Sequence, residues 1–143
     1  MKTIRWQFVM EGTGEYIPFR SADDVVRRMH AAGHADRDRE CFVAFLLNTK
    51  HNIIAEEVVS IGILDGSLVH PREVYKAAVC AGAASVIVAH NHPSGDTTPS
   101  VQDREVTTRL RDAGKIIGIP LVDHVIVGAG TSDFFSFRTT GTW

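Results

Sequence analysis

The order of apolar and polar residues along the chain predicts alternating strands and helices. Residues 4 to 10 alternate apolar and polar side chains, which is the period of a half-buried strand. Ser21 is followed three residues later by Asp24, a pairing typical of a helix N-terminus, and Gly33 fits the end of that helix. We therefore expect the chain to begin with a strand and a helix.

Two apolar segments come next and predict a hairpin. The run CFVAFLLN (41–48) is almost continuously apolar, which is typical of a strand covered on both faces. The polar turn NTKHN (48–52) then leads into a second strand at IIAEEVVSIG (53–62).

A second helix is expected to feed directly into a buried strand. His70 and Pro71 begin the helix, because proline is favoured in a first helical turn, and Gly82 lies near its end. The apolar strand ASVIVAH (84–90) follows, so His90 falls at the carboxyl end of a strand. Ligands of α/β sheets gather beyond the carboxyl ends of strands, which draws attention to this position.

The last part of the chain adds a third helix and two strands. The helix is expected from Ser100 to about Ala113, with Gly114 as its stop. Strands are expected over PLVDHVIVG (120–128) and FFSF (134–137). The predicted fold class is α/β, with a central, mostly buried mixed sheet and helices packed against it.

Composition adds limits on size and partners. The chain has 143 residues, of which 44% are hydrophobic and 22% charged, as expected for one globular domain spanning residues 1–143. The net charge is −2, and lysine and arginine are scattered rather than clustered. A nucleic-acid partner is therefore possible but unsupported by the charge pattern.

The N-terminus and the cysteines indicate a reducing compartment. The first residues, MKTIRWQFVMEG, contain no continuous apolar block, so we expect neither a signal peptide nor a membrane partner, and a cytoplasmic location follows by default. Cys41 and Cys80 lie in apolar surroundings without CxxC spacing, which is typical of reduced core cysteines.

The segment HNHPSGDTTPSVQD (90–103) carries the residues with the clearest chemistry. In an extended backbone, side chains two apart share a face, so His90 and His92 can present ring nitrogens to one point. Asp103 can supply a third, anionic ligand. Two histidines and one carboxylate leave a fourth position for water, which is the pattern of a catalytic zinc site.

A plainer explanation exists for part of this segment. Ser100 and Asp103 fit the start of a helix, where serine caps and an acidic residue meets the positive end of the dipole. The two roles are compatible, because the helix N-terminus would fix the carboxylate of Asp103. Capping alone does not account for the paired histidines.

The other histidines suggest no second site. We interpret four as surface or core residues: His30, His34, His51 and His70. His124 is a competing ligand, and Asp123 beside it could orient a histidine from behind. We favour a structural role for both.

Besides the metal ligands, a hydrolytic site needs a general base. Glu40, at the start of the strand CFVAFLL, is the preferred candidate, with Glu56, Glu57 and Glu73 as alternatives. The chain lacks both the HExxH pattern of metalloproteases and the HxE and PCxxC patterns of zinc deaminases. The consecutive letters HNH do not form the motif of HNH nucleases, whose residues are dispersed along a ββα unit.

Together these residues resemble the JAMM signature: an upstream Glu, then HxHP, a short spacer and SxxD. The matching positions are Glu40, HNHP at 90–93 and SVQD at 100–103. The wider sequence is similar to the JAMM domain of the RadC family from about residue 40 to residue 143. RadC-like proteins often carry a helix-hairpin-helix region, which is not expected in this chain.

The resemblance implies a cytidine-deaminase-like JAB/MPN fold and a zinc-dependent hydrolase. It implies one Zn²⁺ per chain, held by His90, His92 and Asp103, with Glu40 as general base and Ser100 stabilising the oxyanion. The expected substrate is a peptide or isopeptide bond in a peptide or protein. The alternative is a non-catalytic or DNA-repair-associated interaction module that retains the metal site.

Overall fold

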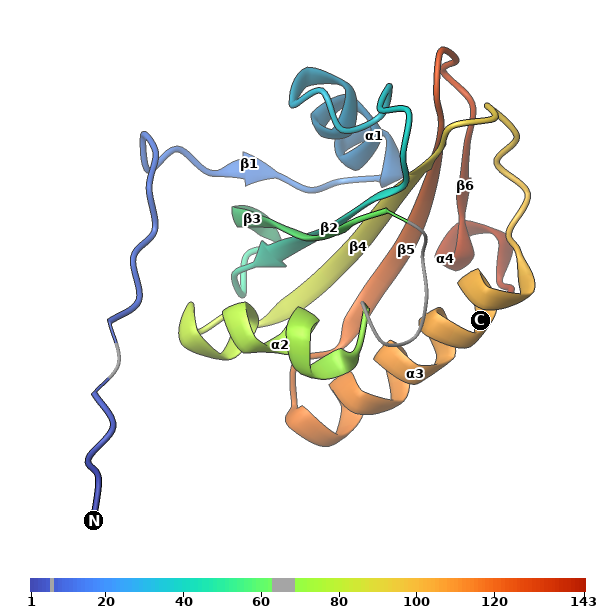
Figure 1. The fold of residues 1–143 in the computed structure, drawn as a ribbon. Helices are drawn as coiled ribbons and strands as arrows, with labels where there is room; N and C mark the ends of the chain where they lie inside the picture. The colour runs from blue at the N-terminus through green and yellow to red at the C-terminus, as the bar shows by residue number, and fades with distance from the viewer. Residues whose placement is uncertain (6, 63–68) are drawn as a thin grey trace.

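The computed structural model describes residues 1–5, 7–62 and 69–143, and within them the chain forms an α/β fold. The strands make one mixed sheet in the order β1-β3-β2-β4-β5-β6, in which only β4 and β5 pair in parallel (Figure 1). The predicted fold class is thus confirmed. The elements are β1 (Ile17–Pro18), α1 (Ala22–Ala31), β2 (Cys41–Leu47), β3 (Asn52–Ile61), α2 (Pro71–Cys80), β4 (Ser85–His92), α3 (Val101–Ile117), β5 (Leu121–Gly128), β6 (Phe134–Ser136) and α4 (Phe137–Thr140).

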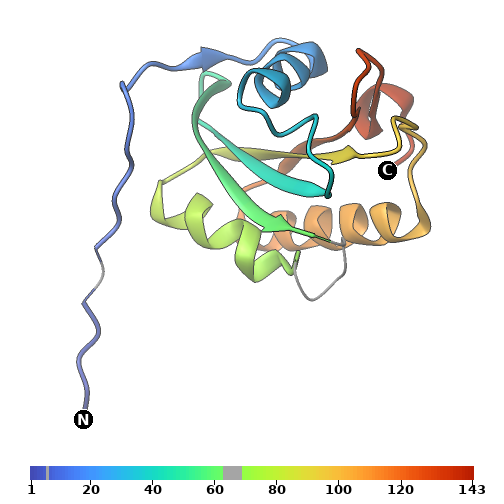
Figure 2. The same cartoon turned by 45° about the horizontal axis from the view of Figure 1, so that its top comes forward.

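The apolar strands β2 and β4 form the centre of the sheet, and every residue in both is buried. Side chains of a strand alternate between faces, so each strand contributes to two cores. Val43 and Phe45 face α1, whereas Phe42 and Leu46 face α2 and α3. Figure 2 shows α1 on one side of the sheet and α2 and α3 on the other. The sheet is therefore covered on both faces, as its continuous apolar runs predicted.

The predicted end of α3 at Gly114 is wrong. The helix continues to Ile117 and ends at Gly118, which has a φ of 81°. Gly114 lies inside the helix, where a Cβ atom would sit 2.4 Å from Oη of Tyr75 and 2.7 Å from the carbonyl oxygen of Ile119. The glycine therefore permits close packing of α3 rather than ending it.

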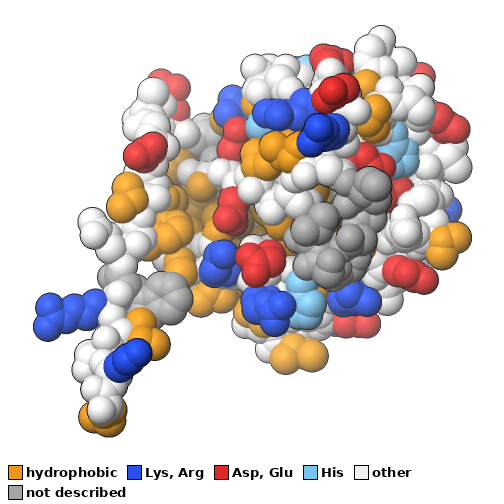
Figure 3. Space-filling model, in the orientation of Figure 1, with side chains coloured by type: hydrophobic (Ala, Val, Ile, Leu, Met, Phe, Trp, Pro, Cys, Tyr) orange, Lys and Arg blue, Asp and Glu red, His pale blue; other side chains and the backbone are white. Residues whose placement is uncertain are grey.

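The predicted strand over residues 4–10 is also wrong. Trp6 lies outside the described residues, and the rest of the segment is exposed and forms no strand. Figures 1 and 3 show it extending away from the sheet, with apolar side chains in the open. Alternation alone does not make a strand without a partner, and among the described residues the edge of β3 away from β2 pairs only with Ile17 and Pro18 of β1.

The last predicted strand is shorter than expected. It covers Phe134–Ser136, and Phe137 instead begins the short helix α4. In the part of the chain that the structure describes, no helix is both long and apolar enough to cross a membrane. On the face seen in Figure 3, acidic and basic side chains are interspersed rather than gathered by sign.

Candidate metal centre

Two elements bring the candidate ligands together. His90 and His92 occupy alternate positions at the end of β4, on the face that also carries Phe42 and is covered by α3. Asp103 lies in the first turn of α3. All three residues are buried, with exposed fractions of 0%, 9% and 1%. The ring of His90 stacks on Phe42 at a centroid distance of 5.9 Å, which fixes its plane.

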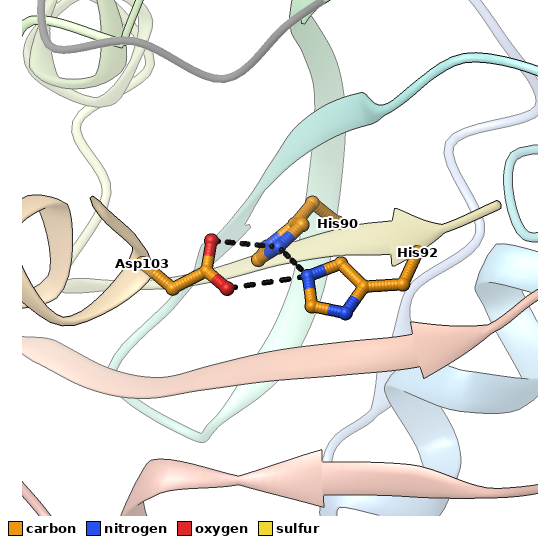
Figure 4. Close-up of side chains that lie close together, drawn as sticks. All are labelled: His90, His92 and Asp103. Carbon is orange, nitrogen blue, oxygen red and sulfur yellow. Dashed lines mark hydrogen bonds and ion pairs between the residues drawn. The ribbon is translucent and has the colours of Figure 1, made fainter. Parts of the chain in front are cut away.

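The polar atoms of these three side chains converge on one point (Figure 4). Nε2 of His90 lies 3.1 Å from Oδ1 of Asp103, and Nε2 of His92 lies 3.2 Å from Oδ2. The two Nε2 atoms are 3.0 Å apart. Because one ligand atom of each residue lies within 4.8 Å of the others, the cluster could hold a single metal ion. The grouping expected from the sequence is therefore present.

The start of α3 holds the carboxylate of Asp103 in place. The N–H of Ser100 donates to Oδ2 of Asp103 at 2.8 Å, and the N–H of Asp103 donates to Oγ of Ser100 at 3.0 Å. This reciprocal pair is a capping box, so the helix cap and the candidate ligand are the same residue. Burial disfavours the charged carboxylate, but hydrogen bonds from His90 and His92 outweigh it and hold the pKa of Asp103 well below its ordinary value. The ligand is therefore anionic.

The loop after β4 sets the protonation of the His92 ring. Nδ1 of His92 lies 2.6 Å from the carbonyl oxygen of Asp96, which can only accept, so Nδ1 carries a hydrogen. In the charged ring Nε2 donates to Asp103, and in the neutral ring Nε2 carries the lone pair that could bind a metal. Burial opposes the charged form, yet the Asp103 and Asp96 hydrogen bonds and the charges of Asp103 and Glu40 raise the pKa of His92.

The position of Glu40 follows from the pairing of β2 with β4. Phe42 faces His90 in this antiparallel pair, so continuing the register by two residues brings Glu40 opposite His92. The negative charge of Glu40 is one of the groups that raise the pKa of His92. Glu40 is only partly buried, so it lies at the mouth of the cluster. Its role as base stays a prediction.

Two of the three alternative bases form salt bridges elsewhere in the structure. Glu56 makes a paired salt bridge to Arg28 of α1, on the opposite face of the sheet. Glu73 pairs with Lys76 on the surface of α2 at 3.1 Å. Glu57 lies on β3 opposite Ala44, and burial raises its pKa.

The role of Asn91 was not predicted from the sequence, although this residue lies between the two histidines. Its side chain points to the other face of β4, where Oδ1 accepts from the N–H of Cys41 at 2.6 Å. Nδ2 donates to the carbonyl oxygens of Arg37 and Arg39 at 3.2 and 3.1 Å. These three bonds bracket Glu40 and tie its segment to the strand that carries the histidines. The sequence feature that could have indicated this role is the alternation of side chains along β4, which places Asn91 on the face opposite to the histidines.

His124 and Asp123 have different surroundings. His124 is fully buried on β5, and its Nε2 lies 2.8 Å from Nδ1 of His90, on the side of that ring away from Asp103. Burial, reinforced by the neighbouring His90, lowers the pKa of His124 well below its ordinary value, so the ring is neutral. The carboxylate of Asp123 accepts from Ser136 Oγ at 2.6 Å and from the N–H of Arg138 at 3.0 Å, which fastens the start of α4.

Comparisons with known proteins match most of the chain, including the residues of the candidate site. A family model described as a RadC-like JAB domain matches residues 19–142. A UPF0758 protein of Rubrobacter xylanophilus is 57% identical over 107 residues, which cover 75% of this chain and 46% of that protein. A UPF0758 protein of Geobacillus kaustophilus is 43% identical over 150 residues, covering 91% of this chain and 66% of that protein. The chain spans about half the length of the curated relatives it matches.

Proposed function

Since the chain belongs to the RadC-like JAB domain family, which confirms the resemblance drawn from its motif, we propose that it is a zinc-dependent hydrolase of peptide or isopeptide bonds. The observation that carries the proposal is the buried convergence of two imidazoles and one carboxylate beside Glu40. The mixed sheet and its helices are consistent with the JAB/MPN fold of this family.

The donor set favours zinc. Imidazole nitrogen and carboxylate oxygen suit Zn²⁺, and three protein ligands are the number found in catalytic rather than structural zinc sites. Nε2 of His90, Nε2 of His92 and the carboxylate of Asp103 would be the ligands. When bound, the ion supplies a Lewis acid that lowers the pKa of water to about 7 and polarises a carbonyl.

Glu40 would supply the proton transfer. Its carboxylate, at the mouth of the cluster, would accept a proton from the attacking water and pass it to the leaving amine. A positioned general base contributes on the order of 10² to 10⁴ in rate. Asn91 holds the backbone on both sides of Glu40, which suits a group that must stay in place during the reaction.

Ser100 would stabilise the oxyanion through its hydroxyl. Its backbone N–H already donates to Asp103, so that group is occupied. Oγ accepts from the N–H of Asp103 through a lone pair, which leaves the hydroxyl hydrogen to donate.

The proposal is tested by separating metal binding from turnover. Glu40→Gln is expected to keep bound zinc but lose at least 100-fold in rate on a cleavable peptide or isopeptide, because only the base is removed. Asp103→Asn is expected to lose the metal, and Glu73→Gln, on the surface of α2, serves as the control. Full activity in Glu40→Gln would contradict the assignment of the base. Bound zinc without turnover on any such substrate would favour the interaction-module alternative.

A further inference from the structure

A chain of buried hydrogen bonds runs from the back of His90 to helix α3. Nδ1 of His90 lies 2.8 Å from Nε2 of His124, and Nδ1 of His124 lies 2.6 Å from Oγ1 of Thr107. Thr107 in turn donates to the carbonyl oxygen of Asp103 at 2.6 Å. His90, His124 and Thr107 are all essentially inaccessible to solvent, with exposed fractions of 0%, 0% and 1%. These hydrogen bonds thus connect Nδ1 of His90 with the backbone carbonyl oxygen of Asp103, on the sides of both candidate ligands that face away from the metal position.

The hydrogens in this chain have one consistent order. A hydroxyl has a single hydrogen, and Thr107 gives it to a carbonyl oxygen that can only accept. Thr107 must then accept from Nδ1–H of His124. A neutral His124 with a hydrogen on Nδ1 has a bare Nε2, which must accept from Nδ1–H of His90.

The consequence falls on the ligand atom. When Nδ1 of a neutral His90 carries the hydrogen, Nε2 keeps its lone pair, and Nε2 is the atom that faces Asp103 and His92. In the opposite order Thr107 would donate to His124, which would donate to His90. The hydrogen of His90 would then lie on Nε2 and block the lone pair that a metal requires.

We propose that Thr107 and His124 are positioning residues that keep a hydrogen on Nδ1 of His90, so that Nε2 is the nitrogen left to bind the metal. The proposal rests on the metal site proposed above. It extends the general pattern in which the second nitrogen of a ligating histidine is held by a partner. Here that partner is itself a histidine, whose own hydrogen is placed by a threonine on the helix that supplies Asp103.

The first part of the test needs no metal. Long-range ¹H–¹⁵N NMR spectra of the metal-free protein distinguish histidine rings protonated on Nδ1 from those protonated on Nε2. His124 is expected to carry its hydrogen on Nδ1 in the wild type and in Thr107→Ser, and to lose this preference in Thr107→Val, which has nearly the same shape without the hydroxyl. A wild-type His124 protonated on Nε2 would overturn the proposal.

The second part measures zinc affinity by competition with a chelating indicator. Thr107→Val is expected to bind zinc 10- to 100-fold more weakly, because the Nδ1–H of His124 loses its acceptor. His124→Asn is expected to show a similar loss, since its shorter side chain places no acceptor where Nε2 of His124 meets His90. Thr107→Ser and His124→Gln are expected to stay within a few-fold of the wild type, because a hydroxyl or a side-chain carbonyl oxygen is restored.

The outcomes separate this proposal from the function proposed above. Equal zinc affinity in Thr107→Val and the wild type overturns the proposal even if the enzyme is active. If the wild type binds no zinc, the proposed function fails, and the tautomer of His124 in the metal-free protein decides the present proposal by itself.

Discussion

Replacing Asn91 by alanine is expected to loosen the segment that carries Glu40 while leaving the metal ligands in place. The side chain of Asn91 makes three hydrogen bonds to the backbone, one to Cys41 and one each to Arg37 and Arg39. Each contributes a net ~1 kcal/mol, so their loss costs about 3 kcal/mol of unfolding free energy. For a chain of this size the cost corresponds to a fall in Tm of roughly 10 °C.

The effect on function has its own signature. Asn91 faces away from His90 and His92, so zinc affinity in Asn91→Ala is expected to stay within a few-fold of the wild type. Turnover is expected to fall as it does in Glu40→Gln. The amide of Cys41, which donates to Asn91, is expected to exchange faster with deuterium.

Asn48→Ala is the matched control. The side chain of Asn48 accepts from the N–H groups of Lys50 and Asn52 at the other end of β2, so its removal destabilises the protein without touching Glu40. Chemical denaturation, hydrogen exchange and zinc titration on both variants complete the assay. An Asn91→Ala protein with unchanged stability and unchanged exchange at Cys41 would refute the reasoning.

Three further predictions follow from packing, charge and ligand linkage. Gly114→Ala is expected to lower the unfolding free energy by about 1–3 kcal/mol in denaturant titrations, because its Cβ would meet the carbonyl oxygen of Ile119 and Oη of Tyr75. Glu105→Ala, on the exposed side of α3, is the control. Equal stability of the two variants would contradict the close packing at Gly114. Burial raises the pKa of Glu57 in the folded state above its ordinary value of 4.5. Its contribution to stability is therefore present below pH 4.5 and is lost as pH rises through the raised folded pKa. Glu57→Gln is expected to flatten this part of a stability–pH curve, and an unchanged slope would count against the prediction. Zinc at about 1,000 times its Kd is expected to stabilise the wild type by ~4 kcal/mol in thermal melts, and the same gain in Asp103→Asn would show that zinc acts elsewhere.

The sequence was most informative where local pattern and long-range packing agree. The continuous apolar runs of β2 and β4 required cover on both faces, and the structure provides it. The spacing of His90 and His92 on a strand was enough to put both rings on one face. The capping signal at Ser100 and Asp103 predicted the start of α3.

The failures have a common physical cause, since each depended on a partner distant in sequence. The alternation over residues 4–10 has no paired edge, and Gly114 makes room for Tyr75, which approaches from α2. The contact between His124 and His90 depends on the parallel register of β4 and β5, which local sequence does not specify. Thr107, four residues after Asp103 on the same helical face, was the local clue to that contact.

The most direct test of the central claim is the metal content of untagged protein, measured by elemental analysis on the wild type and on His92→Ala together. The account predicts close to one zinc per chain in the wild type and little in the variant, because Nε2 of His92 is one of the three convergent ligand atoms. A wild type that takes up no zinc, even after incubation with the metal, would contradict it, as would a His92→Ala protein that retains a full complement.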